Sequence, residues 1–329
     1  MHIISYLGLL LGLIVLILLL VWFGLGEILN LLFTSGWKLL LLPVVWSPAV
    51  FVASYSWQFL FNDNRVPSYP KLLAANWMGR AINTLLPVAT IGGEIAKARL
   101  ITLWGCRGID ATASALVDKT VQALALIPWG IIGIILLLVL TQDNQIAFPA
   151  LIGFSLLAMG IFGFILVQRA GMFGNLARLM NKFYRSDKWP NISDHARDID
   201  QLVLELYSNH RKFMLSVILK TLSLMLETFE IWLACYLMGH NIGFVEAMML
   251  KSLVSTVNNI VFFIPNAYGI QEGGFILFGA LLGMSPDFSL ALSLATRIRE
   301  LCIDLPGVVT WQIIESRQFI NKKTGKLKA

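Results

Sequence analysis

Charged side chains are scarce in this sequence. Asp, Glu, Lys and Arg together make up 13% of its 329 residues, whereas a soluble domain usually carries about 25%. Hydrophobic residues make up 57% of the chain. This composition predicts an all-α integral membrane protein with several crossing helices. No stretch beyond about 45 residues lacks a long apolar run, so we expect no separate water-soluble domain.

Cysteine and histidine are rare as well. The three cysteines, Cys106, Cys235 and Cys302, lie far apart, and no two histidines have the spacing of metal ligands. The sequence contains no P-loop, no HExxH or CxxC motif and no serine-hydrolase pattern. Aromatic and basic patches of the kind that bind nucleic acid are missing, although the formal charge is +6. We therefore expect no metal, no cofactor, no enzymatic catalysis and no nucleic-acid partner.

Long apolar runs dominate what remains. A helix needs about 20 apolar residues to cross a bilayer, and six segments meet this requirement. The six segments are 4–24, 39–61, 112–140, 147–168, 213–238 and 288–314. The sequence thus predicts six crossing helices.

Two further segments, 71–105 and 246–283, are apolar but interrupted near the middle. Pro87, Gly92 and Gly93 interrupt the first, and Pro265 and Gly269 interrupt the second. Broken helices occur at membrane depth where they are buried in protein or line a wet cavity. We interpret each segment as a re-entrant helical hairpin that enters and leaves on one side. Two ordinary short crossings are the alternative, and they leave the topology unchanged.

The basic residues predict the orientation. Lysines and arginines gather around the first hairpin, between 169 and 212, and in the tail, while the other loops carry none. With six crossings, all the basic segments fall on one side, which the positive-inside rule makes cytoplasmic. We expect a protein of the cytoplasmic (inner) membrane with both termini in the cytoplasm.

Residues 170–212 predict two amphipathic helices on the cytoplasmic side. One apolar stripe runs from Met172 to Phe183. The other consists of Ile199, Leu202, Val203, Leu206 and Tyr207. Such helices suit the surface of an anionic membrane, and a solvated linker that packs on the helix bundle is the alternative.

The second half of the chain resembles the first. A shift of 178 residues places Pro87 on Pro265, Glu94 on Glu272, and Gly105 on Gly283, without a gap over about 57 positions. Each copy holds three crossings and one hairpin, so the second copy must be inserted upside down. The predicted domains are a first inverted repeat at 1–140, a second at 141–315 and a basic cytoplasmic tail at 316–329. Inverted repeats with broken helices are typical of alternating-access transporters.

Several charges fall within the predicted membrane segments, where an unpaired charge costs about 2.5–3.5 kcal/mol. The repeat predicts two ion pairs, Glu94 with Lys119 and Glu272 with Arg297. The candidate substrate-binding residues are Glu94, Lys119, Glu272, Arg297, Arg299 and Glu300. A structural role is the alternative, because a carboxylate in the first turn of a helix complements its dipole and could tie hairpin to helix.

Other charges have less specific interpretations. Lys97 and Arg99 could extend toward the cytoplasmic mouth. Glu227 and Glu230 form either an acid pair or one polar helix face. Helical spacing places Arg297, Glu300 and Asp304 on one face of the last helix, with Arg299 directed to another surface. The list of membrane charges also includes Arg80, Asp118 and Lys251.

Three segments carry a resemblance to a known family: "LPVATIGGEIAKAR", "ALVDKTVQALAL" and "IPNAYGIQEGGFILFGALLGMSPDFSLALSLATRIREL". They resemble the membrane region of lysylphosphatidylglycerol synthases. That family also contains stand-alone flippase-like proteins, including some associated with hopanoid biosynthesis. The resemblance covers roughly residues 5–315. The chain departs from the family at Lys119, where members usually have arginine, and at Ile270 and Gln271. The resemblance implies a lipid translocator without the aminoacyl-transferase domain of the synthases.

Two functions are compatible with these features. The first is a translocator that moves an amphiphilic or lipid-linked substrate, with a polar or anionic head group, between leaflets by alternating access. The alternative is a non-catalytic scaffold or accessory subunit of a lipid-modifying or glycan-assembly system. A homo-oligomer or a membrane enzyme partner is compatible with either function.

Overall fold

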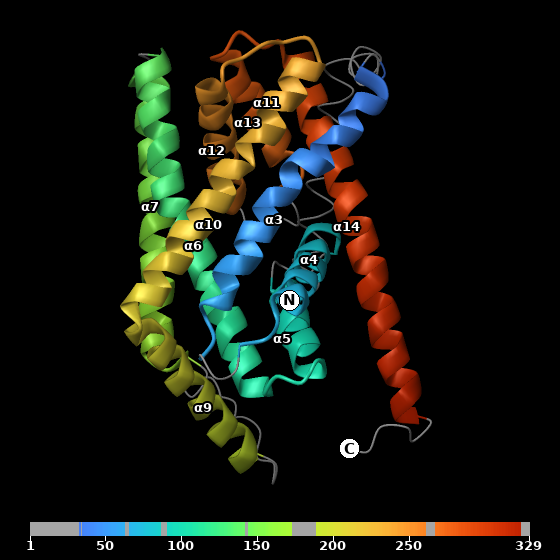
Figure 1. The fold of residues 1–329 in the computed structure, drawn as a ribbon. Helices are drawn as coiled ribbons and strands as arrows, with labels where there is room; N and C mark the ends of the chain where they lie inside the picture. Colours follow the sequence, from blue (N-terminus) through green and yellow to red (C-terminus); the bar gives the residue numbers. More distant parts are fainter. Residues whose placement is uncertain are drawn as a thin grey trace.

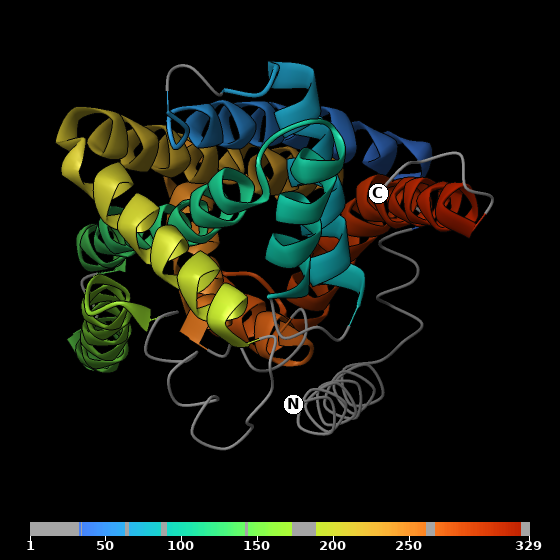
Figure 2. The ribbon, with the colours of Figure 1, turned by 90° about the horizontal axis from the view of Figure 1, so that it is seen from below.

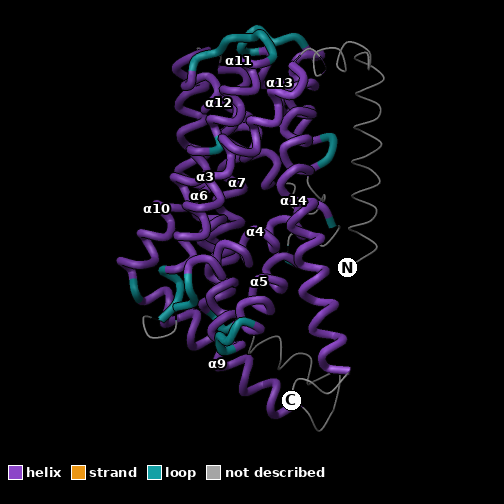
Figure 3. The backbone as a smooth tube through the Cα atoms, turned by 45° about the vertical axis from the view of Figure 1, so that its right-hand side comes forward, coloured by secondary structure: helices purple, strands orange, loops and turns teal. Residues whose placement is uncertain are grey.

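The computed structural model describes residues 33, 35–62, 66–86, 91–141, 144–172, 189–260 and 267–323. Its regular elements in these ranges are all helical, and the loops lie mainly at the two ends of the bundle (Figure 3). The elements are η1 (Gly36–Leu41), α3 (Leu42–Gln58), α4 (Tyr69–Leu85), α5 (Gly92–Leu103), α6 (Gly108–Thr141), α7 (Asn144–Arg169), α9 (Trp189–Ser208), α10 (His210–Leu226), α11 (Thr228–Leu237), α12 (Phe244–Ile260), α13 (Ile270–Ala280) and α14 (Pro286–Lys323).

Three stretches of the described chain are helical, long and apolar enough to cross a membrane. They are Gly36–Gln58, Gly108–Leu140 and Leu151–Arg169. These stretches correspond to three of the six predicted crossings. The prediction of an all-α membrane protein is thus confirmed.

The other predicted crossings have different outcomes. The segment 213–238 is helical as α10 and α11, interrupted only at Glu227, whose φ of −63° and ψ of −17° remain helical. The segment 288–314 lies within the 38 residues of α14. The first predicted crossing, 4–24, lies outside the described residues.

Each interrupted segment contains two short helices, as the sequence predicts. The first holds α4 and α5, and the second holds α12 and α13. Pro87 and Pro265 lie in the gaps between them, outside the described residues. Gly92 and Gly93 begin α5, and Gly269 precedes α13 with a φ of 78° that suits glycine. At about 1.5 Å per residue, the 12 residues of α5 extend about 18 Å, well short of a bilayer core of about 30 Å.

The two pairs of short helices lie at opposite ends of the bundle, with α12 and α13 at the top of Figure 1 and α4 and α5 in the lower half. The longer helices run between these ends, and α7 and α14 occupy opposite edges in both Figure 1 and Figure 2. Apolar side chains form two separate cores, one that includes Phe275 and Phe278 of α13 and another that includes Leu100 and Ile101 of α5. Each pair of short helices therefore packs into an apolar core of its own.

The helices of the first pair cross in direct contact. A Cβ atom on Gly93 of α5 would overlap the carbonyl oxygen of Gly79 on α4. The backbone N–H of Gly93 also donates to the side-chain oxygen of Asn83 at 2.7 Å. Only glycine permits this approach, which explains one of the two glycines predicted to mark the break.

The predicted amphipathic helix around residue 200 is α9. Val203 and Tyr207 are buried in the same core as α5, and Ile199, Leu202 and Leu206 pack against it. The apolar stripe thus faces the protein, which agrees with the alternative interpretation that the segment packs on the bundle. Most of the other predicted stripe, from Phe173 to Phe183, lies outside the described residues.

Candidate functional site

Buried charges gather in two clusters, and the first contains three lysines and two carboxylates. The first charged cluster consists of Glu94, Lys97, Asp118, Lys119 and Lys220. The ammonium of Lys97 lies 2.8 Å from Glu94 and 2.7 Å from Asp118. The ammonium of Lys220 lies 2.6 Å from the second oxygen of Asp118. Asp118 thus bridges two buried lysines, and the cluster as a whole carries one excess positive charge.

Lys119 is the most weakly compensated lysine of the first charged cluster. Its ammonium lies 4.0 Å from Glu94, and it donates to the side-chain oxygen of Gln122 at 3.2 Å. About one third of its side chain is exposed, whereas Lys97 and Lys220 are almost completely buried. The predicted pairing of Glu94 with Lys119 is confirmed, although Lys97 is the closer partner of Glu94.

A polar cavity of about 250 Å³ opens beside this cluster. Every member of the first charged cluster lines it, together with Arg80 of α4 and Glu227 at the junction of α10 and α11. The remaining lining residues are Trp46, Ala49, Val50, Ala53, Asn76, Asn83, Thr84, Gln122, Ser223, Leu224 and Asn259. Since these residues come from α3, α4, α5, α6, α10 and α12, the cavity depends on the packing of both halves of the chain.

The second charged cluster consists of Glu227, Glu230, Lys251, Glu272, Arg297, Arg299 and Glu300. Within it, Arg297 lies 3.2 Å from both Glu272 and Glu300. Glu272 is fully buried and also accepts hydrogen bonds from the backbone N–H of Gly269 at 2.7 Å and from Ser293 at 3.2 Å. The predicted pair of Glu272 and Arg297 is confirmed, and Glu272 caps α13 as the structural alternative supposes.

Arg299 belongs to the same network through a different partner. Its guanidinium lies 2.7 Å from Glu230 and 3.7 Å from Glu300. Lys251 adds contacts of 2.9 Å to Glu227 and 3.8 Å to Glu230. Arg299 therefore reaches another helix, as predicted, but Glu300 links it to Arg297.

Trp46 of α3 joins the second cluster to the wall of the cavity. The guanidinium carbons of Arg80 and Arg299 lie 4.2 Å and 4.5 Å from the centre of its ring, in cation–π geometry. Arg80 also pairs with Asp304 of α14. These contacts hold the indole ring in place between the two charged regions.

The structure places only some of the predicted site residues at the cavity. Glu94 and Lys119 line it, whereas Glu272, Arg297, Arg299 and Glu300 do not. The prediction that Lys97 extends toward the cytoplasmic mouth is wrong, because its side chain is buried against Asp118. Arg99 is exposed and donates to Glu315 of α14, which is compatible with that prediction.

Lys220 is the member of the first charged cluster that the sequence analysis misses. It lies in the predicted crossing 213–238, and a lysine at that depth was the available signal. The cluster of His, Cys, Asp and Glu side chains that a metal ion would need is not found among the described residues.

Membrane-length apolar helices together with paired charges buried between them define a polytopic membrane protein. The family model for the lysylphosphatidylglycerol synthase TM region matches residues 9–305, and the chain belongs to this family. Comparisons with curated proteins and with solved structures found no match.

Proposed function

We propose that this protein moves a lipid with a polar or anionic head group between the leaflets of the cytoplasmic membrane, without changing the lipid covalently. The observation that carries the proposal is the polar cavity beside the first charged cluster. A cavity lined by charges is costly inside a membrane protein, so it points to a polar ligand that passes through.

The charge of the cluster favours an anionic group such as a phosphodiester. Three lysines face two carboxylates, and Lys119 is only weakly satisfied. Hydrogen bonds between an ammonium and a phosphate oxygen are charge-assisted and stronger than neutral ones. We propose that the head group binds Lys119 and displaces Glu94, while the hydrocarbon chains remain in the bilayer.

An inverted repeat would supply the alternation. Helices α5 and α13 begin 178 residues apart, and so do α6 and α14. Gly105 and Gly283, separated by the same distance, both have positive φ, at 101° and 73°. These correspondences, and the position of the short-helix pairs at opposite ends, support units at 1–140 and 141–315 with re-entrant hairpins (Figure 1).

In the opposite state, the second unit would take the conformation of the first. Glu272 and Arg297 would then occupy the places that Glu94 and Lys119 occupy here, with Arg299 and Glu300 beside them. In this scheme, the buried pair of Glu272 and Arg297 is the closed counterpart of Glu94 and Lys119. The unit whose pair lines the open cavity is the one that binds the lipid.

The test is reconstitution of the pure protein in liposomes that contain fluorescent phosphatidylglycerol, with dithionite quenching as the readout. We expect wild type to flip the lipid, Lys119→Met to slow flipping about tenfold, and Lys119→Arg to retain most activity because the positive charge is kept. Arg211→Met, which removes an exposed cation of α10, is the matched control. A wild-type protein that flips neither this lipid nor labelled phosphatidylethanolamine would favour the scaffold function.

A further inference from the structure

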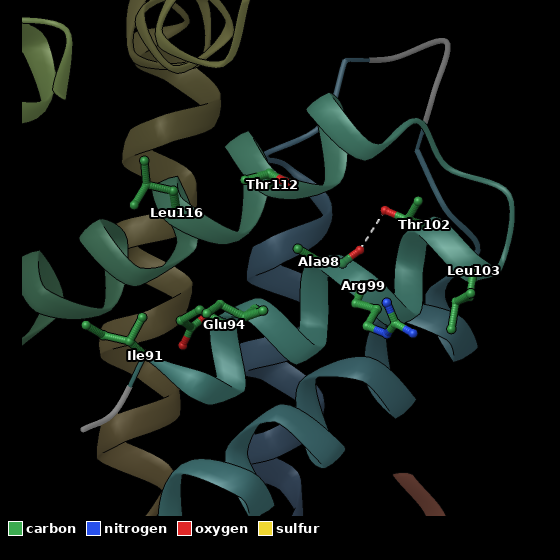
Figure 4. A pocket seen from close by; sticks show the side chains of 9 residues that line it. Ile91, Glu94, Ala98, Arg99, Thr102, Leu103, Thr112 and Leu116 are labelled. Carbon is green, nitrogen blue, oxygen red and sulfur yellow. Dashed lines mark hydrogen bonds between the residues drawn. The ribbon is translucent and has the colours of Figure 1, made fainter. Parts of the chain in front are cut away.

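A groove of about 480 Å³ lies between α5 and α6 (Figure 4). It is lined by Ile91, Glu94, Ile95, Ala98, Arg99, Thr102, Leu103, Thr112 and Leu116. Most of these side chains are apolar, and Ile91 and Ile95 are 51% and 65% exposed. The groove therefore opens on the surface of the bundle, where a membrane protein contacts lipid chains.

Glu94 belongs to both spaces. It lines the apolar groove, and it also lines the polar cavity beside the first charged cluster. Figure 4 shows its side chain between that of Ile91, which immediately precedes α5, and that of Ala98 on α5. The groove and the cavity are thus adjacent compartments that differ in polarity, and Glu94 is the residue that lines both.

The contacts of Glu94 allow it to move. Its close cationic partner is Lys97 at 2.8 Å, and Lys119 lies farther away at 4.0 Å. The corresponding Glu272 is fully buried and is held by Gly269, Ser293 and Arg297. Glu94 has partial exposure and none of the capping bonds that fix its counterpart among the contacts described.

A second apolar space is a less favourable entrance. It measures about 350 Å³, lies between α3 and α4, and shares Trp46 and Val50 with the polar cavity. Trp46 is buried under the guanidinium groups of Arg80 and Arg299. Displacing this large, buried ring would leave a bigger void than moving the smaller, partly exposed side chain of Glu94.

We propose that the groove between α5 and α6 binds a hydrocarbon chain of the lipid whose head group occupies the polar cavity, and that Glu94 is the movable partition between chain and head group. This inference rests on the proposed function. The groove is mostly apolar and adjoins the polar cavity at Glu94, so an amphiphile suits the two spaces together. If its head group contacts Lys119, its hydrocarbon chain lies on the far side of Glu94, along Ile95 and Leu116.

The first experiment fills the groove. Ile95→Trp adds a bulky side chain at an exposed position, so the protein should still fold, and its thermal melt checks this. Flipping of fluorescent phosphatidylglycerol should fall about tenfold. Ile135→Trp is the matched control, because Ile135 is 52% exposed on α6 and does not line the groove; it should flip at the wild-type rate.

The second experiment locates the chain. Phosphatidylglycerol with a diazirine on one acyl chain is photo-cross-linked to the reconstituted protein, and the labelled peptides are identified by mass spectrometry. We expect labels on residues 91–103 and 112–116, reduced in Ile95→Trp and retained in Ile135→Trp.

The outcomes separate the two levels of interpretation. If wild type flips, Lys119→Met is slow, and Ile95→Trp flips normally without groove labels, the groove inference is wrong while the proposed function stands. If wild type does not flip any probe, the proposed function fails and this inference fails with it.

Discussion

Arg297 places its guanidinium 3.2 Å from the carboxylate of Glu272, a side chain without exposed surface. The corresponding pair of the first half, Lys119 and Glu94, is separated by 4.0 Å and borders a cavity. The two pairs thus share their positions in the repeated sequence but differ in tightness. The closed pair is therefore expected to contribute to stability, and the proposed function assigns ligand binding in this state to the open pair.

The closed pair predicts a stability loss. Arg297→Met should reduce the free energy of unfolding by about 3–5 kcal/mol, because Glu272 then remains buried without its cation. The double variant Arg297→Met with Glu272→Gln should recover part of this loss. Thermal melts and SDS unfolding in detergent would measure it. Arg317→Met, at an exposed position on α14, should remain within about 0.5 kcal/mol of wild type. An equally small effect of Arg297→Met would refute the pairing.

Asp118 should matter more for stability than Lys220, one of its two cationic partners. Asp118→Asn removes the carboxylate shared by Lys97 and Lys220 and leaves two ammonium groups buried together, so we expect a loss of at least about 3–5 kcal/mol. Lys220→Met leaves the contact between Lys97 and Asp118 intact and should cost less. Melting temperatures of wild type, Asp118→Asn and Lys220→Met give the order, and a larger loss for Lys220→Met than for Asp118→Asn would contradict the bridging role.

Two glycines of the short helices should respond to alanine with opposite signs. Gly93→Ala forces a methyl group into the backbone of Gly79 and should destabilise by about 1–3 kcal/mol or more. Gly273→Ala, in α13, meets no atom within 4 Å and should stabilise by up to about 1 kcal/mol through helix propensity. Paired thermal melts test the contrast, and equal shifts would show that the close crossing of α4 and α5 is not maintained in the membrane.

The proposed orientation predicts a labelling pattern. In a background with Cys106, Cys235 and Cys302 replaced by serine, a cysteine at Asn241 should react with an impermeant maleimide on intact cells. A cysteine at Gln201 of α9 should react only after permeabilisation. Both positions are exposed, so access across the membrane decides the result. Labelling of position 201 from outside would reverse the orientation.

Several features followed from the sequence because they depend on local chemistry. A proline followed closely by glycine favours a break in a helix, so the division of 71–105 and 246–283 into short helices was predictable. Single prolines do not suffice, since Pro128 and Pro306 lie inside α6 and α14. The pairs Glu94–Lys119 and Glu272–Arg297 were predictable because a buried carboxylate needs a cation and the repeat aligned the candidates. The apolar stripe of α9 followed from helical periodicity.

Only the tertiary structure decided which charges meet across distant helices. Lys220 reaches Asp118 because α10 packs beside α6 in one particular rotation, and no local pattern encodes that rotation. The same packing buries Lys97, places Glu94 between the groove and the cavity, and keeps Glu272 away from both. Local sequence determined where the helices begin and break, whereas side-chain packing between helices far apart in the chain determined which of the two matched glutamates borders an open space.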